Sequence, residues 1–235
     1  MKIILLGYGK MGKIIERVAI ERGHQISARI DVDNAEDFDS AYGDVAIEFS
    51  HPDAAFENVK KCINRSIPVV CGTTGWLNGK AEIESLCKKT NGTFFYASNY
   101  SLGVNMFFKL NEYIARMMNN LPEYEISMDE IHHTEKKDAP SGTAITLAQG
   151  IIENVDRKKK WVNRKTGKPE DVYIESFRID QVPGTHVVKY ESAIDDIEIK
   201  HIAHSREGFA KGAVMVAEWL KDKKGVFSMD DFLKF

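Results

Sequence analysis

The chain has 235 residues, of which 43% are hydrophobic and 29% charged, and its formal net charge is −3. This composition excludes a disordered chain, and the acidic balance gives no overall positive field for nucleic acid. The three cysteines include no CxxC pair, so neither a disulfide framework nor a paired-cysteine zinc site is indicated. The apolar run at residues 3–6 is too short for a signal peptide or a membrane span. We therefore expect a soluble, cytoplasmic protein that has neither nucleic acid nor a membrane as partner.

The first hundred residues alternate between strand and helix patterns. Short apolar runs predict strands at residues 3–6, 26–30, 45–49, 67–71 and 93–96. Helical spacing occurs at residues 11–19, 52–64 and 80–89. Residues 32–43 form a short acidic link between the second and third strands. Strands that alternate with helices favour a parallel sheet covered on both faces.

The pattern changes near residues 99–105. Residues 105–118 have the spacing of an amphipathic helix whose apolar positions are Met106, Leu110, Tyr113, Ile114 and Met117, and we expect this face to pack. A strand then leads to His132, a polar loop covers 134–140, and a helix is expected from Ser141.

The remainder contains several strands in succession. The basic run 157–160 and the segment 166–169 predict an exposed, solvated connection. Strand-like runs follow at 172–179, 186–192 and 197–203, then a helix at 207–221 and a short turn after Ser228. Successive strands favour an α+β region with a mixed sheet.

A glycine motif lies between the first strand and the first helix: Gly7-x-Gly9-x-x-Gly12. In such motifs one glycine permits the tight turn, one lets the backbone approach a pyrophosphate, and one allows close packing of helix and strand. The helix N-terminus offers unpaired N–H groups to phosphates. The motif therefore predicts a Rossmann-like dinucleotide site, to which Lys10 can add a positive charge.

Asp31 ends the second strand, 19 residues after Gly12, where a carboxylate accepts hydrogen bonds from the adenosine ribose. Its charge opposes a 2′-phosphate, so NADH is favoured, although Arg29 on the same face can weaken that preference. A solvated acid at a strand end is the alternative interpretation. Gly72, Thr73 and Thr74 also follow a strand and are a weaker candidate for contact with the cofactor.

The densest cluster of chemical groups lies between Glu130 and Ala144. Ser141 is suited to cap a helix, Gly142 leaves room for an anion to approach the backbone, and Lys136 supplies a positive charge. A neighbouring histidine can donate a proton near neutral pH. The alternatives are an exposed polar loop with a capped helix and a metal ion held by Glu130 and His133. No established metal-ligand spacing supports the latter, and we predict no metal.

The segment Glu130-x-His-His-x-x-Lys136-x-Asp-x-Pro-Ser-Gly-Thr-Ala144 resembles the signature of the 4-hydroxy-tetrahydrodipicolinate (dihydrodipicolinate) reductase family. The segments 7–12, 72–75, 99–105 and 205–213 resemble further family motifs in family order, so the resemblance covers nearly the whole chain. It implies NAD(P)H-dependent reduction of a cyclic dicarboxylate to tetrahydrodipicolinate, a step of lysine and diaminopimelate biosynthesis.

The resemblance also implies roles for individual residues. His132 is the expected general acid and Lys136 its cationic partner; the expected substrate-binding residues are His133, Ser141, Gly142 and Thr143. The cofactor would contact Gly7, Tyr8, Gly9, Lys10, Met11, Gly12, Asp31, Gly72, Thr73, Thr74, Ala97, Ser98, Asn99 and Tyr100.

The implied domains are 1–100 for the dinucleotide, 101–205 for substrate binding and homotetramer formation, and 206–235 as a C-terminal helix and tail that returns to the first. Many members carry an arginine directly after the acid at the end of the second strand, whereas Val32 stands here. We therefore expect NADH to be preferred, with residual NADPH use. Two other functions are left open: another two-domain dehydrogenase of amino acids or sugars, and a non-catalytic NAD(H) sensor.

Overall fold

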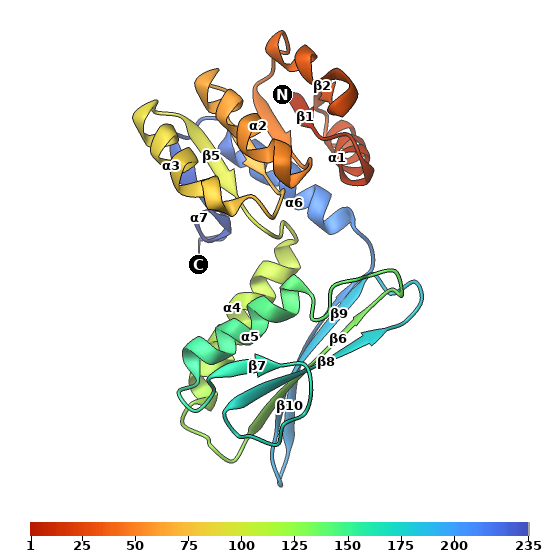
Figure 1. Ribbon diagram of the computed structural model, residues 1–235, viewed down its shortest axis with the longest axis vertical. Coiled ribbons are helices and arrows are strands. Elements are labelled where there is room, and N and C mark those ends of the chain that lie inside the picture. Colours follow the sequence, from red (N-terminus) through yellow and green to blue (C-terminus); the bar gives the residue numbers. More distant parts are fainter. Residues whose placement is uncertain (235) are drawn as a thin grey trace. The chain divides into compact units, whose positions relative to one another are not determined.

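The computed structural model describes residues 1–234 and divides into two compact units (Figure 1). The first unit consists of Met1–Leu102 and the C-terminal segment that begins at Glu207. The second unit consists of Gly103–Arg206.

The first unit is built on a six-stranded parallel sheet with the order β11-β5-β4-β3-β1-β2. Its strands are β1 (Lys2–Leu6), β2 (Gln25–Ile30), β3 (Val45–Glu48), β4 (Val69–Cys71), β5 (Thr93–Tyr96) and β11 (Gly225–Phe227). Its helices are α1 (Lys10–Glu21), α2 (Pro52–Asn64), α3 (Lys80–Lys89), α6 (Glu207–Leu220) and α7 (Met229–Leu233), with 3-10 turns at Val32–Asp39 and Leu77–Gly79.

Alternate residues of β1 show how both faces of this sheet are covered. Ile3 and Leu5 pack with α1 and α6 on one face, whereas Ile4 and Leu6 pack with α2 and α3 on the other. All four side chains are at most 1% exposed. A continuous apolar strand of this kind is typical of a doubly covered parallel sheet, and the α/β prediction is confirmed.

The second unit contains a five-stranded mixed sheet with the order β10-β9-β6-β8-β7. Its strands are β6 (Glu125–His132), β7 (Lys160–Val162), β8 (Asp171–Arg178), β9 (Gly184–Glu191) and β10 (Asp196–Ala203). β6 is parallel to β8 and antiparallel to β9. The helices α4 (Leu102–Met118) and α5 (Gly142–Asn154) contribute to one apolar core with this sheet. Within residues 1–234, no helix has the length and apolar character needed to cross a membrane.

The helix predicted over 105–118 is present as α4, but most of its predicted packed face is exposed: of the five expected residues, Ile114 alone packs against the core, where it is partly buried. Met106, Leu110, Tyr113 and Met117 are 47–59% exposed. The buried positions follow an equally regular stripe: Val104, Phe107, Asn111, Ala115 and Met118. That stripe includes a small residue and an amide, which a search for large apolar side chains overlooks. The Asn111 side-chain N–H donates a hydrogen bond of 2.9 Å to the Leu147 carbonyl, which offsets part of the cost of burying this amide.

The basic run 157–160 is only partly a solvated connection: Lys159 and Lys160 are exposed, as is the segment 166–169, whereas Arg157 is half-buried and Lys158 is buried. Lys158 is 1% exposed, and its ammonium donates to the Glu125 carboxylate and to the Asp171 carbonyl. Arg157 donates to the carbonyls of Met118 and Tyr124. Lys160 begins β7, which pairs with β8. Long aliphatic stems and paired charged ends allow Arg157 and Lys158 to pack where their charges alone predicted exposure.

Candidate functional site

The glycine turn joins β1 to α1. In the first sheet, β2 lies on one side of β1 and β3 on the other, so the order of the strands changes direction next to this turn. Gly7 has φ +93°, and a Cβ there would lie 2.2 Å from the Phe49 carbonyl oxygen. A Cβ on Gly12 would lie 2.3 Å from the Gly7 oxygen, whereas Gly9 faces open space. These three glycines thus supply the turn, the close packing and the open backbone that a pyrophosphate requires.

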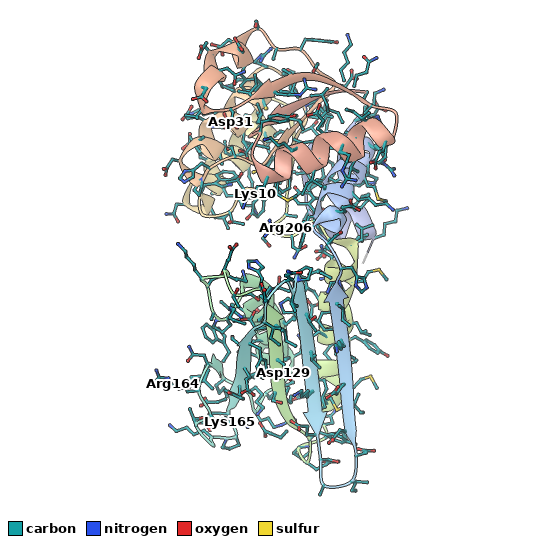
Figure 2. The ribbon with its side chains drawn as sticks, turned by 90° about the vertical axis from the view of Figure 1, so that its right-hand side faces the viewer. Lys10, Asp31, Asp129, Arg164, Lys165 and Arg206 are labelled. Carbon is teal, nitrogen blue, oxygen red and sulfur yellow. The ribbon has the colours of Figure 1, made fainter. Side chains whose placement is uncertain are left out.

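Asp31 directly follows β2 and is exposed. Its carboxylate accepts hydrogen bonds from the Tyr8 N–H at 3.0 Å and the Val32 N–H at 2.9 Å. The acid is therefore tied to the glycine turn in the position expected for a ribose-binding carboxylate. Lys10, the first residue of α1, is exposed in the same unit (Figure 2).

The other predicted cofactor residues follow β4 and β5. Thr73 is buried, and its hydroxyl accepts a 2.9 Å hydrogen bond from the Ser50 N–H, while Thr74 and Ser98 are exposed. The side chain of Tyr100 is 1% exposed and donates to the Cys71 carbonyl at 2.7 Å. Tyr100 therefore belongs to the core by its side chain, and only its backbone remains for a ligand.

In the second unit, polar residues continue the buried face of three strands. On β6 the buried positions run Ile126, Met128, Glu130 and His132. The register places Glu130 opposite His186 of β9, and His132 opposite Arg178 of β8. The sheet thus changes from an apolar to a polar inner face as β6 approaches its C-terminal end.

Glu130 is the centre of this polar group and is fully buried. One carboxylate oxygen accepts from Arg178 at 3.0 Å, and the other accepts from the Ser141 N–H at 2.9 Å. The second oxygen also lies 3.4 Å from Nδ1 of His132 and 4.0 Å from Nε2 of His186.

Burial and hydrogen bonding act in opposite directions on Glu130. Burial alone would raise the pKa of this carboxyl, but the nearby His132 imidazole and the hydrogen bonds from Ser141 and Arg178 hold the pKa below its usual range. Burial lowers the pKa of His186 to about 3, and the neighbouring His132 acts in the same direction. The group therefore combines an ionised carboxylate with a neutral His186 at neutral pH.

The carboxylate and imidazoles of Glu130, His132 and His186 place potential ligand atoms within 4.8 Å of one another. The Arg178 guanidinium bonded to Glu130 adds a positive charge at this place, which opposes a second cation. His133, the other residue of the metal alternative, is not among these three.

The loop after β6 carries Lys136 and is fastened by Arg178. The guanidinium donates to the Lys136 carbonyl at 3.2 Å and to the Asp138 carbonyl at 2.6 Å. The Lys136 ammonium contacts both carboxylate oxygens of Asp138 at 2.8 Å. An incoming carboxylate would therefore compete with Asp138 for this ammonium. His133 begins the loop and is half-buried.

The loop ends at the N-terminus of α5, where Ser141 is the N-cap. Its hydroxyl accepts from the Ala144 N–H at 3.2 Å and lies 3.2 Å from Nε2 of His186. The Ser141 side chain is thus committed to the helix and to the buried network. Gly142 is exposed, with open space where a side chain would stand, and Thr143 is half-buried. This helix end can accept an anion on its backbone N–H groups.

Sequence reasoning missed the parts played by Arg178 and His186 and considered Glu130 only as a metal ligand. Strand alternation carried a signal for all three. On β8, Arg178 lies on the same face of the strand as the buried residues Val172 and Ile174. On β9, His186 lies on the same face as the buried residues Val188 and Tyr190. A charged or ionisable residue that continues an apolar stripe marks a buried polar site.

Comparison with known proteins gives matches over both units. Two family models match: "Dihydrodipicolinate reductase, N-terminus" at residues 1–100 and "Dihydrodipicolinate reductase, C-terminus" at residues 103–233. A 4-hydroxy-tetrahydrodipicolinate reductase of Christiangramia forsetii is 51% identical over 99% of this chain and 98% of its own length. One of Methanosarcina barkeri is 38% identical over 90% of this chain and 80% of its own.

Among solved structures, a dipicolinate-bound dihydrodipicolinate reductase from Paenisporosarcina sp. TG-14 has a TM-score of 0.80 at 20% identity and covers 97% of both chains. A myo-inositol 2-dehydrogenase from Lactobacillus plantarum has a TM-score of 0.57 at 11% identity, covering 94% of this chain and 88% of its own. At these identities the structural matches support the fold alone.

Proposed function

This chain belongs to the dihydrodipicolinate reductase family, and we propose that it catalyses the NAD(P)H-dependent reduction of 4-hydroxy-tetrahydrodipicolinate to tetrahydrodipicolinate. The relative that is 51% identical over nearly the whole chain carries that reductase name. The observation that carries the proposal within the molecule is the junction of His132, the Lys136 loop and the N-terminus of α5 around Glu130.

His132 is the proposed proton donor. Conversion of the 4-hydroxy substrate to tetrahydrodipicolinate requires loss of the hydroxyl group as water, which leaves a conjugated imine. A nicotinamide cofactor would supply a hydride to that imine when it is bound, and the resulting enamine then needs a proton on carbon. An imidazolium can deliver that proton near neutral pH. The 10% exposure of the His132 side chain leaves it shielded from bulk water while part of it remains accessible.

The substrate is a dicarboxylate, and the second unit offers it several partners. Lys136 would exchange Asp138 for a substrate carboxylate. The N–H groups of Gly142 and Thr143, with His133 and Ser141 beside them, would hold a carboxylate at the helix N-terminus. The ligand of the Paenisporosarcina reductase, dipicolinate, is a cyclic dicarboxylate of this class.

The proposed cofactor residues are those of the glycine turn, Asp31, and the segments after β4 and β5. We propose that NADH is preferred and NADPH is used less well, because the exposed Asp31 carboxylate opposes a 2′-phosphate. Comparable kcat/KM values for the two cofactors would contradict this preference.

We also propose that the protein forms a homotetramer through the second unit. Its proposed location is the cytoplasm. The tetramer rests on the family resemblance, and the exposed apolar residues of α4 are compatible with contacts between chains. Sedimentation equilibrium tests it directly, and a monomer at micromolar concentration would contradict it.

The activity is tested by a coupled assay in which a dihydrodipicolinate synthase converts pyruvate and aspartate semialdehyde while oxidation of NADH or NADPH is followed. Synthase-dependent oxidation is expected. The His132→Gln variant should lower kcat about 100-fold, the scale of general-acid catalysis, without changing the KM for NADH. Lys136→Ala should raise the KM for the substrate, with the exposed neighbour Lys137→Ala as control. NADH binding without any oxidation would favour the sensor or another dehydrogenase.

A further inference from the structure

The two oxygens of the buried Glu130 carboxylate face different partners, one a permanent cation and the other a histidine. Its Oε1 is held by Arg178 at 3.0 Å, and its Oε2 faces Nδ1 of His132 at 3.4 Å. Removing a carboxylate from water is costly unless charge and hydrogen bonds compensate for it. Arg178 and the Ser141 N–H provide that compensation, so Glu130 stays ionised at neutral pH.

The two histidines around Oε2 are not equivalent. His186 is farther from the oxygen, at 4.0 Å, and lies beside the Ser141 hydroxyl. Its low pKa, caused first by burial, keeps it neutral. Nδ1 of His132 is buried and makes no well-aligned hydrogen bond among the described residues, so Glu130 is the acceptor that it faces. Of the two histidines, His132 is therefore the one that directs an N–H group at this carboxylate.

The other side of the His132 ring meets Gly184. A Cβ at Gly184 would lie 3.1 Å from Nε2 of His132, so the glycine leaves room at this nitrogen. With Nδ1–H directed at Glu130, Nε2 is the position from which a proton can be passed to a ligand. This resembles the way in which a carboxylate fixes the tautomer of a catalytic histidine.

We propose that Glu130 is a positioning residue of the reaction: it orients His132 through Nδ1 and stabilises its protonated form, while Arg178 anchors both Glu130 and the Lys136 loop. This inference rests on the proposed function. In the catalytic cycle Nε2 of His132 gives its proton to the substrate carbon, and solvent restores it. Glu130 remains ionised throughout and transfers no proton.

The charged and titratable groups around His132 come from four places: Glu130 on β6, Arg178 on β8, His186 on β9, and Lys136 with Asp138 on the loop. Glu130 is the anion at ion-pair distance from the imidazole, since Asp138 contacts Lys136. Substitution of Glu130 should therefore shift the pH of half-maximal kcat on the alkaline side more than substitution of any other single acidic residue.

The decisive experiment is the pH profile of kcat for Glu130→Gln in the full-length enzyme. We expect kcat at its optimum to fall about 10- to 100-fold, and the pH of half-maximal kcat on the alkaline side to move down by about one to two units. The KM for NADH should not change. Glu130→Asp keeps the charge and should restore most of the pH shift. Glu153→Gln, which removes an exposed carboxylate of α5, should match the wild type.

Arg178→Gln provides a second variant with the opposite expected shift. It removes a cation close to His132 but leaves Glu130, so the alkaline limit should move to higher pH. This variant decides the question if Glu130→Gln does not fold. A fall in kcat with an unmoved pH profile in either variant would overturn the proposal, because it would show that the network only maintains the shape of the loop. Absence of activity in the wild type would instead defeat the proposed reaction.

Discussion

A single ion pair next to the glycine turn bears on cofactor choice. Arg29, which could have offset the charge of Asp31, is bonded to Glu16 and lies over the Tyr8 ring at 5.7 Å. The Tyr8 hydroxyl also donates to Glu16. The hydrogen bond from Arg29 is the main reason that the pKa of Glu16 lies below its ordinary value. The arginine is therefore engaged on α1 and not available to a 2′-phosphate.

We predict that Glu16→Gln raises kcat/KM for NADPH relative to NADH by about two- to fivefold, the range expected when one partly exposed ion pair is released. The ratio of the two specificity constants, measured in the coupled assay, gives the result. Glu21→Gln is the matched control, since Glu21 lies on the same helix but pairs with Arg17. An equal change in both variants would show that Arg29 has no special access to the cofactor.

At the scale of elements, α6 packs within the first unit through a glycine that contacts the segment after β5. A Cβ on Gly212 would lie 1.8 Å from the Tyr100 carbonyl oxygen, a backbone atom that cannot rotate away. Gly208, one turn earlier on the same helix, has only a side-chain atom at 3.7 Å. The two glycines thus differ in the space around them while sharing one helix.

Gly212→Ala should destabilise the protein by about 3 kcal/mol, since the helix must move away from the strand-end segment. Gly208→Ala should be neutral or slightly stabilising, because alanine favours a helix. Urea unfolding followed by circular dichroism measures both. Equal midpoints for Gly212→Ala and the wild type would contradict the close packing.

Helices and strands whose apolar residues recur at a regular spacing were predictable from the sequence. Short strands that depend on pairing with an adjacent strand were not. The bounds 52–64 and 80–89 agree with α2 and α3 because proline, turn residues and apolar spacing act together there. β7 and β11 have three residues each, and both exist because an adjacent strand accepts their backbone hydrogen bonds. Most of the packed face of α4 was missed because Asn111 and Ala115, an amide and a small residue, interrupt its apolar stripe.

At the scale of the whole molecule, the sequence identified the α/β and mixed-sheet regions and the motifs of the candidate site. It did not reveal that β6, β8 and β9 each contribute an ionisable residue to one buried group. Glu130 is distant in sequence from Arg178 and His186, and the register of β6 with β8 and β9 makes them neighbours. Side-chain direction within a strand is predictable, whereas the pairing of strands depends on the complete fold.

The stability of the whole molecule should decline on the acid side of neutrality. His186 has a folded-state pKa of about 3 against 6.5 when exposed, and burial also lowers the pKa of His201. The unfolded chain therefore binds protons first as the pH falls below about 6.5, and each such histidine removes up to about 1.4 kcal/mol per pH unit. Glu130, whose pKa is depressed, adds a further loss below about pH 4.5.

Urea unfolding measured at intervals of pH should show a plateau from about pH 7 to 9 and a steady loss of stability from about pH 6.5 downward. His186→Gln cannot take up this proton, so its stability should depend less steeply on pH between 6.5 and 4.5, even if its plateau is lower. His133→Gln, the half-buried neighbour of His132, should keep the wild-type slope. If His186→Gln had the same slope as the wild type, His186 would not be a neutral buried histidine, and the acid sensitivity would come from His201 and the carboxylates.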